Sequence, residues 1–361
     1  MPDSLAPRPT RLAGGLALSA AALIAAGSLY PFSGWQSNGL PPWAFLFSGW
    51  PRYWTGNDLA VNVLAYLPLG TLVGIGLSRR LRSLPAALAA WLSCVLLSLV
   101  VEMLQHYLPS RIPSQFDLIC NAAGAALGVG LATWRARPLL AIEDRLATVL
   151  ARVPHPAYGL ALLALWLLTQ LSADAVFGTT GDLRRIFGAP AAGALSLALP
   201  LEALAVACHL VLVGLLANRL FGSNRPALPS IVLCLVSAAA CATAARAIWL
   251  EPAHAFDWLS PSTISGLLAG SVALLLVLLL PATAMRVAAT VALGLGVAAI
   301  NLLPVHPYQT ALAPWQLGAY LNINGLTRWL GVVWPLFALV WLIAGPWQRS
   351  RWHETVFRRS L

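Results

Sequence analysis

The chain has 361 residues, of which 59% are hydrophobic and 9% charged, and its formal net charge is +10. This balance excludes an ordinary soluble globular domain. The basic excess comes from arginine alone, and the arginines are spread over connections between long apolar runs. We therefore expect an all-α, polytopic bundle in the membrane and no nucleic-acid partner.

Ten apolar runs have roughly the length that crosses a bilayer. In chain order they cover residues 12–30, 57–77, 84–105, 117–134, 156–174, 191–217, 228–249, 264–283, 287–303 and 326–345. Basic residues precede the first run, which contains small residues at 25–27, and this pattern also fits a signal peptide. Because it is long enough to cross a bilayer and would pack on the next helix, we expect it to remain as a helix.

Arginine placement predicts the topology, because cytoplasmic connections carry the excess of basic residues. Sixteen of the arginines fall on alternate connections, and only six lie on or near the opposite side. The sixteen are Arg8, Arg11, Arg79, Arg80, Arg82, Arg135, Arg137, Arg145, Arg152, Arg219, Arg225, Arg286, Arg349, Arg351, Arg358 and Arg359. The count predicts that both termini are cytoplasmic, with an even number of spans.

The longest basic connection inside the chain predicts the domain boundary. We expect a four-helix domain at 1–137, an amphipathic cytoplasmic linker at 138–155 and a six-helix domain at 156–361. Apolar residues from Leu139 to Val153 recur in the linker at helical spacing. Such a helix lies in the membrane interface or packs on the bundle, and the pattern fits both arrangements equally.

Acids and amides interrupt the apolar runs of the first domain at helical spacing. The pairs are Asp58 with Asn62, Glu102 with Gln105, and Asp117 with Asn121. Residues three or four apart share one face of a helix. On the predicted topology all three acids lie near the outer leaflet. Hydrocarbon tolerates such residues when they pair with one another or have a function, so we regard these six residues as a candidate ligand site.

Arg111 lies in the short outer turn between Glu102 and Asp117. Its guanidinium could bridge either carboxylate or grip a phosphate, and we add it to the candidate site. His106 is nearby, but one histidine does not make a metal site. The five cysteines lie in apolar runs without metal-ligand spacing, so we expect neither a metal nor a cofactor.

The order and spacing of these residues resemble the VanZ-like family, named after a teicoplanin-resistance protein. The resemblance covers roughly residues 12–135 and includes Pro68, Gly70, Gly124 and Gly128, the last two spaced for close helix contact. It implies a function in the bacterial envelope, in the cytoplasmic (inner) membrane, linked to glycopeptide resistance or surface polysaccharide. It implies no particular reaction.

Four interpretations of the polar residues remain open. The preferred one is an outer-leaflet pocket that binds the head of an envelope lipid or lipid-linked cell-wall precursor. A second is a membrane enzyme acting on a lipid phosphate, with Glu102 or Asp117 as general base and Arg111 stabilising charge. A third is a transporter formed by both halves. The fourth is purely structural, with polar side chains that fix three helices. The sequence does not determine the oligomeric state.

The second half has scattered polar residues of its own, which we interpret mainly as structural pairs. Glu202 and His209 are seven apart in one run, and Arg246 is expected to pair with Glu251 or another outer acid. Tryptophans in the outer loops, at positions 35, 43, 50, 54 and 315, are expected to anchor at the headgroup level.

Overall fold

The computed structural model describes residues 12–50, 56–151, 153–184, 198–222, 227–303 and 321–344. Every regular element in these ranges is a helix, as the composition predicts. The chain divides into two compact units, Met1–Ala151 and Arg152–Leu361. Each unit is described below by itself.

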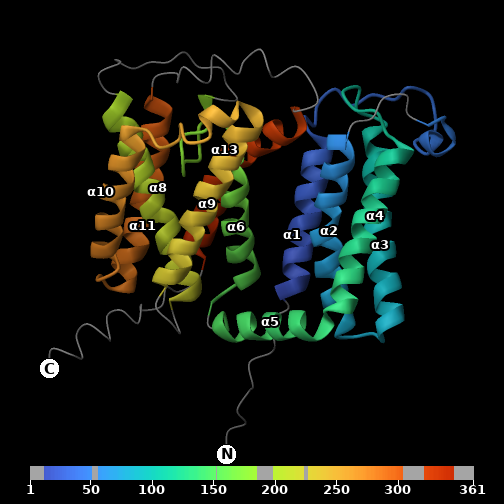
Figure 1. The fold of residues 1–361 in the computed structure, drawn as a ribbon, viewed down its shortest axis with the longest axis horizontal. Helices are drawn as coiled ribbons and strands as arrows, with labels where there is room; N and C mark the ends of the chain where they lie inside the picture. The colour runs from blue at the N-terminus through green and yellow to red at the C-terminus, as the bar shows by residue number, and fades with distance from the viewer. Residues whose placement is uncertain are drawn as a thin grey trace, which may run out of the picture. The chain divides into compact units, whose positions relative to one another are not determined.

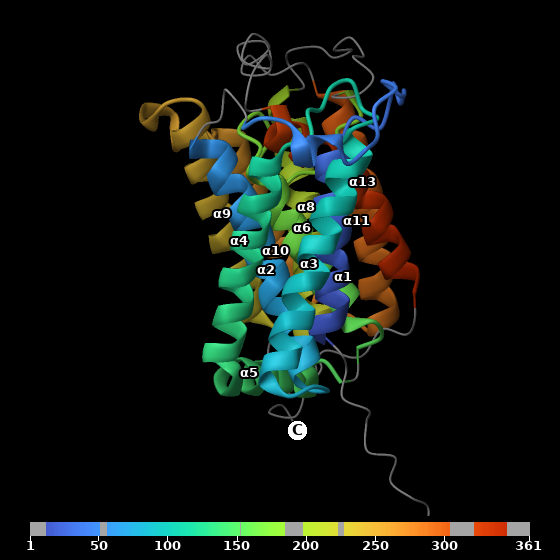
Figure 2. The same ribbon diagram turned by 90° about the vertical axis from the view of Figure 1, so that its right-hand side faces the viewer.

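Among its described residues, the first unit has four long helices and one shorter α-helix, which lies across their end (Figures 1 and 2). The elements are α1 (Leu12–Leu29), the short η1 (Ala44–Phe47), α2 (Gly56–Ser78), α3 (Ser83–Gln105), α4 (Gln115–Trp134) and α5 (Ala136–Val149). All four long helices have the length and composition of membrane spans.

Glycines bring α2 and α4 into close contact, as their spacing predicts. A Cβ at Gly70 would lie 2.5 Å from the Ala125 carbonyl oxygen, and one at Gly128 would overlap the Leu67 carbonyl. The Thr71 hydroxyl lies 2.9 Å from the Leu67 carbonyl oxygen of its own helix and 3.2 Å from the Gly128 carbonyl oxygen, so it shares one proton between the helix and the seam. Small residues allow this approach in membranes, where packing rather than water exclusion holds helices together.

The α5 helix packs on the end of the bundle, which is one of the two arrangements that its pattern allows. Leu139 and Leu140 contact a buried cluster formed by α1, α2 and α4. Glu143 accepts hydrogen bonds from the Ala13 backbone amide at 3.0 Å and from Arg79 Nε at 2.9 Å. The carboxylate thus stabilises the N-terminus of α1. Although burial alone would lower the Arg79 pKa, its bonds to Asp144 and Glu143 raise it.

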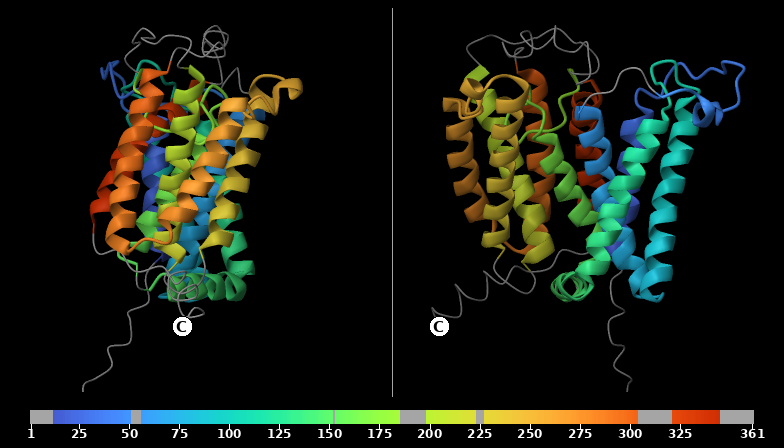
Figure 3. Two further views of the ribbon diagram at one scale, coloured as in Figure 1. Left: turned by 90° about the vertical axis from the view of Figure 1, so that its left-hand side faces the viewer. Right: turned by 45° about the vertical axis from the view of Figure 1, so that its right-hand side comes forward.

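Helices of the second unit lie side by side in Figure 3. They are α6 (Pro156–Thr169), α8 (Ala198–Phe221), α9 (Leu228–Trp249), α10 (Pro261–Val277), α11 (Ala282–Leu302) and α13 (Leu321–Ile343), with the short η3 (Pro252–His254) before α10. The centre of this unit is α8, which contacts α6, α9, α10 and α11. Its long buried face includes Leu212, Leu215 and Leu216.

Each of the ten predicted runs overlaps a helix, but the lengths differ, and the run at 264–283 extends past the end of α10 at Val277. Among the described residues, eight helices are long and apolar enough to cross a membrane, while α6 and α10 are shorter. The predicted span at 156–174 is wrong in its extent, because α6 ends at Thr169. From Gln170 onward the sequence contains several polar residues, and the chain forms turns instead.

An irregular segment, 170–184, follows α6 and is buried among helices of the second unit. Gln170, Ser172 and Thr180 are each at most 3% exposed. Side chains accept hydrogen bonds from backbone groups of this segment. For example, Gln170 Oε1 accepts from the Gly178 backbone amide at 2.8 Å. Such internal partners allow non-helical backbone to lie inside a helical membrane protein.

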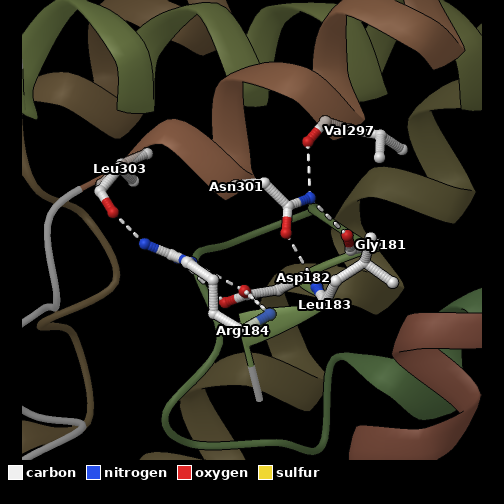
Figure 4. Close-up of polar contacts among 7 residues, drawn as sticks. All are labelled: Gly181, Asp182, Leu183, Arg184, Val297, Asn301 and Leu303. Carbon is white, nitrogen blue, oxygen red and sulfur yellow. Dashed lines mark hydrogen bonds and ion pairs between the residues drawn. The ribbon is translucent and has the colours of Figure 1, made fainter. Parts of the chain in front are cut away.

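The end of segment 170–184 is fixed by an amide and an ion pair (Figure 4). Asn301 on α11 accepts from the Leu183 amide at 2.9 Å and donates to the Gly181 carbonyl at 2.7 Å. The guanidinium of Arg184 binds both carboxylate oxygens of Asp182 and donates to the Leu303 carbonyl. These contacts attach the segment to the end of α11.

Candidate functional site

The three acids of the first unit lie at the same end of its helices. Asp58 is in the first turn of α2, Glu102 is near the end of α3, and Asp117 is in the first turn of α4. Asp117 is close enough to the other two for their like charges to repel. Acids in the first turn of a helix also interact favourably with its dipole, which stabilises Asp58 and Asp117 there.

Asn62 and Asp117 form the direct contact between α2 and α4 at this end. The Asn62 amide nitrogen donates to Asp117 Oδ1 over 2.7 Å. Both side chains are half-buried, as is Asp58 one turn before Asn62. We call Asp58, Asn62 and Asp117 the polar rim. A carboxylate has two oxygens that together accept about four hydrogen bonds, so one bond from Asn62 leaves acceptor capacity at Asp117.

Glu102 is more deeply placed than the rim, with 3% of its surface exposed. Its Oε2 accepts a hydrogen bond from the Ser114 backbone amide over 3.0 Å. Ser114 is the N-cap of α4, and its own hydroxyl accepts from the Phe116 amide. Glu102 therefore connects the end of α3 to the start of α4 and closes the turn between them.

Arg111 and Gln105 both bind the C-terminal end of α1. Arg111 donates to the Tyr30 carbonyl from Nε at 3.0 Å and to the Gly27 carbonyl at 3.1 Å. Gln105 donates to the Ser28 carbonyl at 2.9 Å. Burial lowers the pKa of Arg111, yet a guanidinium stays charged in proteins. The cation therefore satisfies carbonyls that the helix leaves open and complements its negative end.

Asn121 lies one turn deeper in α4 and faces α3. Its amide nitrogen donates to the Ser98 hydroxyl over 2.9 Å. Among the described residues, Asn121 Oδ1 and the buried Tyr66 hydroxyl have no hydrogen-bond partner. Ser98 and Tyr66 join the polar cluster without having been predicted. Ser98 lies four residues before Glu102, on the same face of α3, and this spacing could have identified it from the sequence.

The loop between α1 and α2 docks on the turn between α3 and α4. The Gln36 backbone amide donates to the Tyr107 carbonyl at 2.9 Å, and His106 Nε2 lies 3.0 Å from the Leu40 carbonyl oxygen. Gln115 donates to carbonyls at the end of η1, including that of Phe45. Trp35, Trp43 and Trp50 on this loop remain about half exposed. Trp54 and Trp315 lie outside the described residues.

The family comparison matches the same part of the chain. Residues 16–136 fit the family model described as VanZ/LLP1. This region is a VanZ-like domain. The match covers most of α1 and all of α2 to α4. It therefore includes every residue of the polar rim, together with Glu102, Gln105, Arg111 and Asn121. The chain is thus a multi-pass membrane protein that contains a VanZ-like domain. Neither a curated protein nor a solved structure matches it.

Beyond the VanZ-like domain, the second unit contains buried polar residues that bind backbone groups. His209 on α8 is fully buried, with Nε2 3.1 Å from the Thr180 amide and Nδ1 2.8 Å from the Ala205 carbonyl oxygen. Arg246 donates to the Ala175 carbonyl at 2.8 Å. Segment 170–184 is thus bound from both α8 and α9.

Asp174 and Asp182 were not predicted as polar contacts, because Asp174 falls inside the predicted span at 156–174 and Asp182 lies in the connection after it. Asp174 Oδ2 binds Arg328 of α13 at 2.8 Å. The signal was the run of polar residues that begins at Gln170, which interrupts apolar periodicity only fourteen residues after Pro156. A span that short predicts a helix ending inside the protein.

Proposed function

We propose that the VanZ-like domain binds the polar head of an envelope lipid or a lipid-linked cell-wall or polysaccharide precursor at its polar rim. The observation that carries the proposal is that Asp58, Asn62 and Asp117 are half-buried at one end of the spans. Acids at such a position are expensive to keep in a membrane unless they have a partner or a function. On the topology predicted from arginine placement, this end faces the outer leaflet of the bacterial inner membrane.

The proposed ligand chemistry follows from the charges. Two carboxylates and an amide offer mainly acceptor oxygens, which suit hydroxyl and amine donors of a sugar or headgroup. Arg111 would act as a positioning residue, because its guanidinium holds the end of α1 through Gly27 and Tyr30. This assignment differs from a phosphate clamp, which the sequence alone also allowed. Exposed tryptophans on the adjacent loop suit an interfacial site.

The cellular role that fits this chemistry is control of access to, or assembly of, a surface polymer. A protein that holds the head of a cell-wall precursor would limit its capture by a glycopeptide antibiotic. The enzyme hypothesis requires Arg111 to face the reacting phosphate, whereas Arg111 donates to backbone carbonyls of α1. Binding is therefore the function that the contacts favour.

Native mass spectrometry with lipid identification tests the proposal on the full chain purified in mild detergent. The wild type is compared with Asp117→Asn, which preserves size and removes the charge next to Asn62. We expect a co-purifying lipid or lipid-linked saccharide to be reduced about tenfold in the variant, as expected for loss of a charged hydrogen bond.

The matched control is Asp144→Asn in the same unit, where the aspartate binds Arg79 at the opposite end of α2. It should retain the lipid profile of the wild type. Thermal melting of each sample separates binding from folding. Equal lipid profiles in the wild type and a folded Asp117→Asn variant would contradict the proposal.

A further inference from the structure

A small cavity in the second unit is lined by acids, an arginine and aromatic rings. Its volume is about 30 Å³, which is large enough to hold a group of the size of a water molecule. Asp174, Glu202, Asp257 and Arg246 contribute the charged part of the lining. Carboxylates therefore outnumber the basic group at this cavity, which favours a positively charged occupant.

Glu202 on α8 is the acid whose surroundings are the most informative. Only 8% of its surface is exposed. Its Oε1 accepts from the Ser260 hydroxyl at 2.7 Å and from the Thr263 hydroxyl at 3.3 Å. Within the described ranges no basic side chain lies within ion-pair distance of Glu202, and its second oxygen has no hydrogen-bond partner there.

The other acids of the lining already have basic neighbours outside it. Asp174 binds Arg328, and His254 Nδ1 lies 2.7 Å from Asp257 Oδ2. Arg246 donates to the carbonyls of Ala175 and Ala242. A buried carboxylate is normally paired, and neutral hydroxyls compensate only part of its lost hydration. Glu202 is thus the position at which a cation gains most.

The lining also contains an aromatic pair. The rings of Phe177 and Trp258 stack with centroids 4.4 Å apart, and Trp258 Nε1 donates to the Thr243 hydroxyl at 2.8 Å. Aromatic faces attract ammonium groups. Among the described residues no three His, Cys, Asp or Glu side chains are grouped to hold a metal ion. Aromatic rings beside the one lining carboxylate that lacks a basic neighbour among the described residues suit an ammonium group better than a metal.

We propose that this cavity binds a primary ammonium group, with Glu202 as its carboxylate partner. A terminal ammonium group is about the size of a water molecule and has three N–H donors. One donor binds the second Glu202 oxygen, and the hydroxyls of Ser260 and Thr263 hold that carboxylate in position. The amine belongs either to a free small molecule or to the headgroup of a lipid. This site is separate from the VanZ-like domain.

Thermal melting of the full chain in detergent tests the site with ethylammonium chloride as the probe. We expect a saturable rise in the melting temperature of the wild type. Sodium chloride and tetraethylammonium chloride at equal ionic strength should not produce it, because they lack N–H donors. Glu202→Gln should weaken the apparent affinity about tenfold or more. Glu251→Gln, an exposed acid outside the lining, should bind like the wild type.

A second arm distinguishes the source of the amine. In nanodiscs, phosphatidylethanolamine is compared with phosphatidylcholine, which has no N–H donor. Stabilisation by phosphatidylethanolamine that removes the response to ethylammonium assigns the site to a lipid head, whereas an unchanged response assigns it to a free amine. An equal rise with sodium chloride, an equal rise in Glu202→Gln, or no rise in the wild type would overturn the proposal. If Glu202→Gln fails to fold, the response of the wild type to ethylammonium chloride, compared with its responses to sodium chloride and tetraethylammonium chloride, still tests the proposal.

Discussion

The two units place polar groups among apolar helices in different ways. In the VanZ-like domain they lie at helix seams and helix ends, where Asn62 binds Asp117 and Arg111 binds carbonyls of α1. In the second unit an irregular segment carries them into the bundle, as with Asp182 and Thr180. Seams need close backbones and therefore glycine, whereas an inserted segment needs a side-chain partner for its own backbone groups.

The largest effect is expected from breaking the buried ion pair of the inserted segment. Asp182→Ala leaves Arg184, whose side chain is 11% exposed, without its carboxylate. Removing one partner of a buried pair costs about 3–5 kcal/mol, and chemical unfolding of the purified chain should report it. Asp144→Ala breaks a pair in the first unit whose aspartate is 59% exposed, and should cost at most about 1 kcal/mol. If the two variants lose the same free energy of unfolding, the ion pair of the second unit is no more important for stability than the exposed pair of the first.

A smaller loss is expected when the end of α1 is released. Arg111→Ala removes a charged donor from the Gly27 and Tyr30 carbonyls and should cost about 2–3 kcal/mol. Hydrogen exchange should accelerate at the C-terminal turns of α1 first. The exposed Arg80→Ala is the control. Unchanged exchange in α1 with loss of lipid would mean that Arg111 contacts the ligand instead.

Overpacking the α2–α4 seam should cost about 1–3 kcal/mol. A methyl group at Gly128 overlaps the Leu67 carbonyl, while one at Gly130 on the same helix meets nothing within 4 Å. Gly128→Ala should therefore lower the melting temperature, and Gly130→Ala should leave it equal or slightly higher, since alanine favours helix. A tolerated Gly128→Ala would show that the two helices are farther apart.

The smallest effect is expected from the single hydroxyl that crosses the same seam. Thr71→Val removes the hydrogen bond to the Gly128 carbonyl with little change in volume, and should cost about 0.6 kcal/mol, the average for such bonds in membranes. Thr133→Val, which loses a bond within α4 on an exposed face, is the comparison. A loss of several kcal/mol at Thr71 would mean that polar contacts, and not glycine packing, hold the seam.

The sequence predicted the helices of the VanZ-like domain and the grouping of its acids because both depend on short spacings. Asp58 and Asp117 lie in the first turns of α2 and α4, and Glu102 lies near the end of α3. Because successive helices run in opposite directions, the three acids come to the same end of the bundle. The partners of Arg111 were not predictable in this way. A guanidinium can donate to carbonyl and to carboxylate oxygens equally well. Which of them Arg111 binds depends on the position of the end of α1.

The second unit was less predictable for a different physical reason. Composition alone does not separate a helix that crosses the membrane from a shorter one continued by buried turns, because both bury their side chains. The partners of segment 170–184 come from α8, α9, α11 and α13, which are distant in sequence. Only the polar run after Gln170 indicated that the helix ends early.

Carboxyl labelling tests the central claim most directly, because it reports whether the polar rim is occupied. Membrane vesicles and delipidated protein are treated with a carbodiimide and an amine, and modified residues are identified by mass spectrometry. If the rim binds a headgroup, Asp58 and Asp117 are protected in native membranes and become labelled after delipidation, whereas exposed Asp144 reacts equally in both. Equal labelling of Asp58 and Asp117 in both preparations would contradict headgroup binding at the rim.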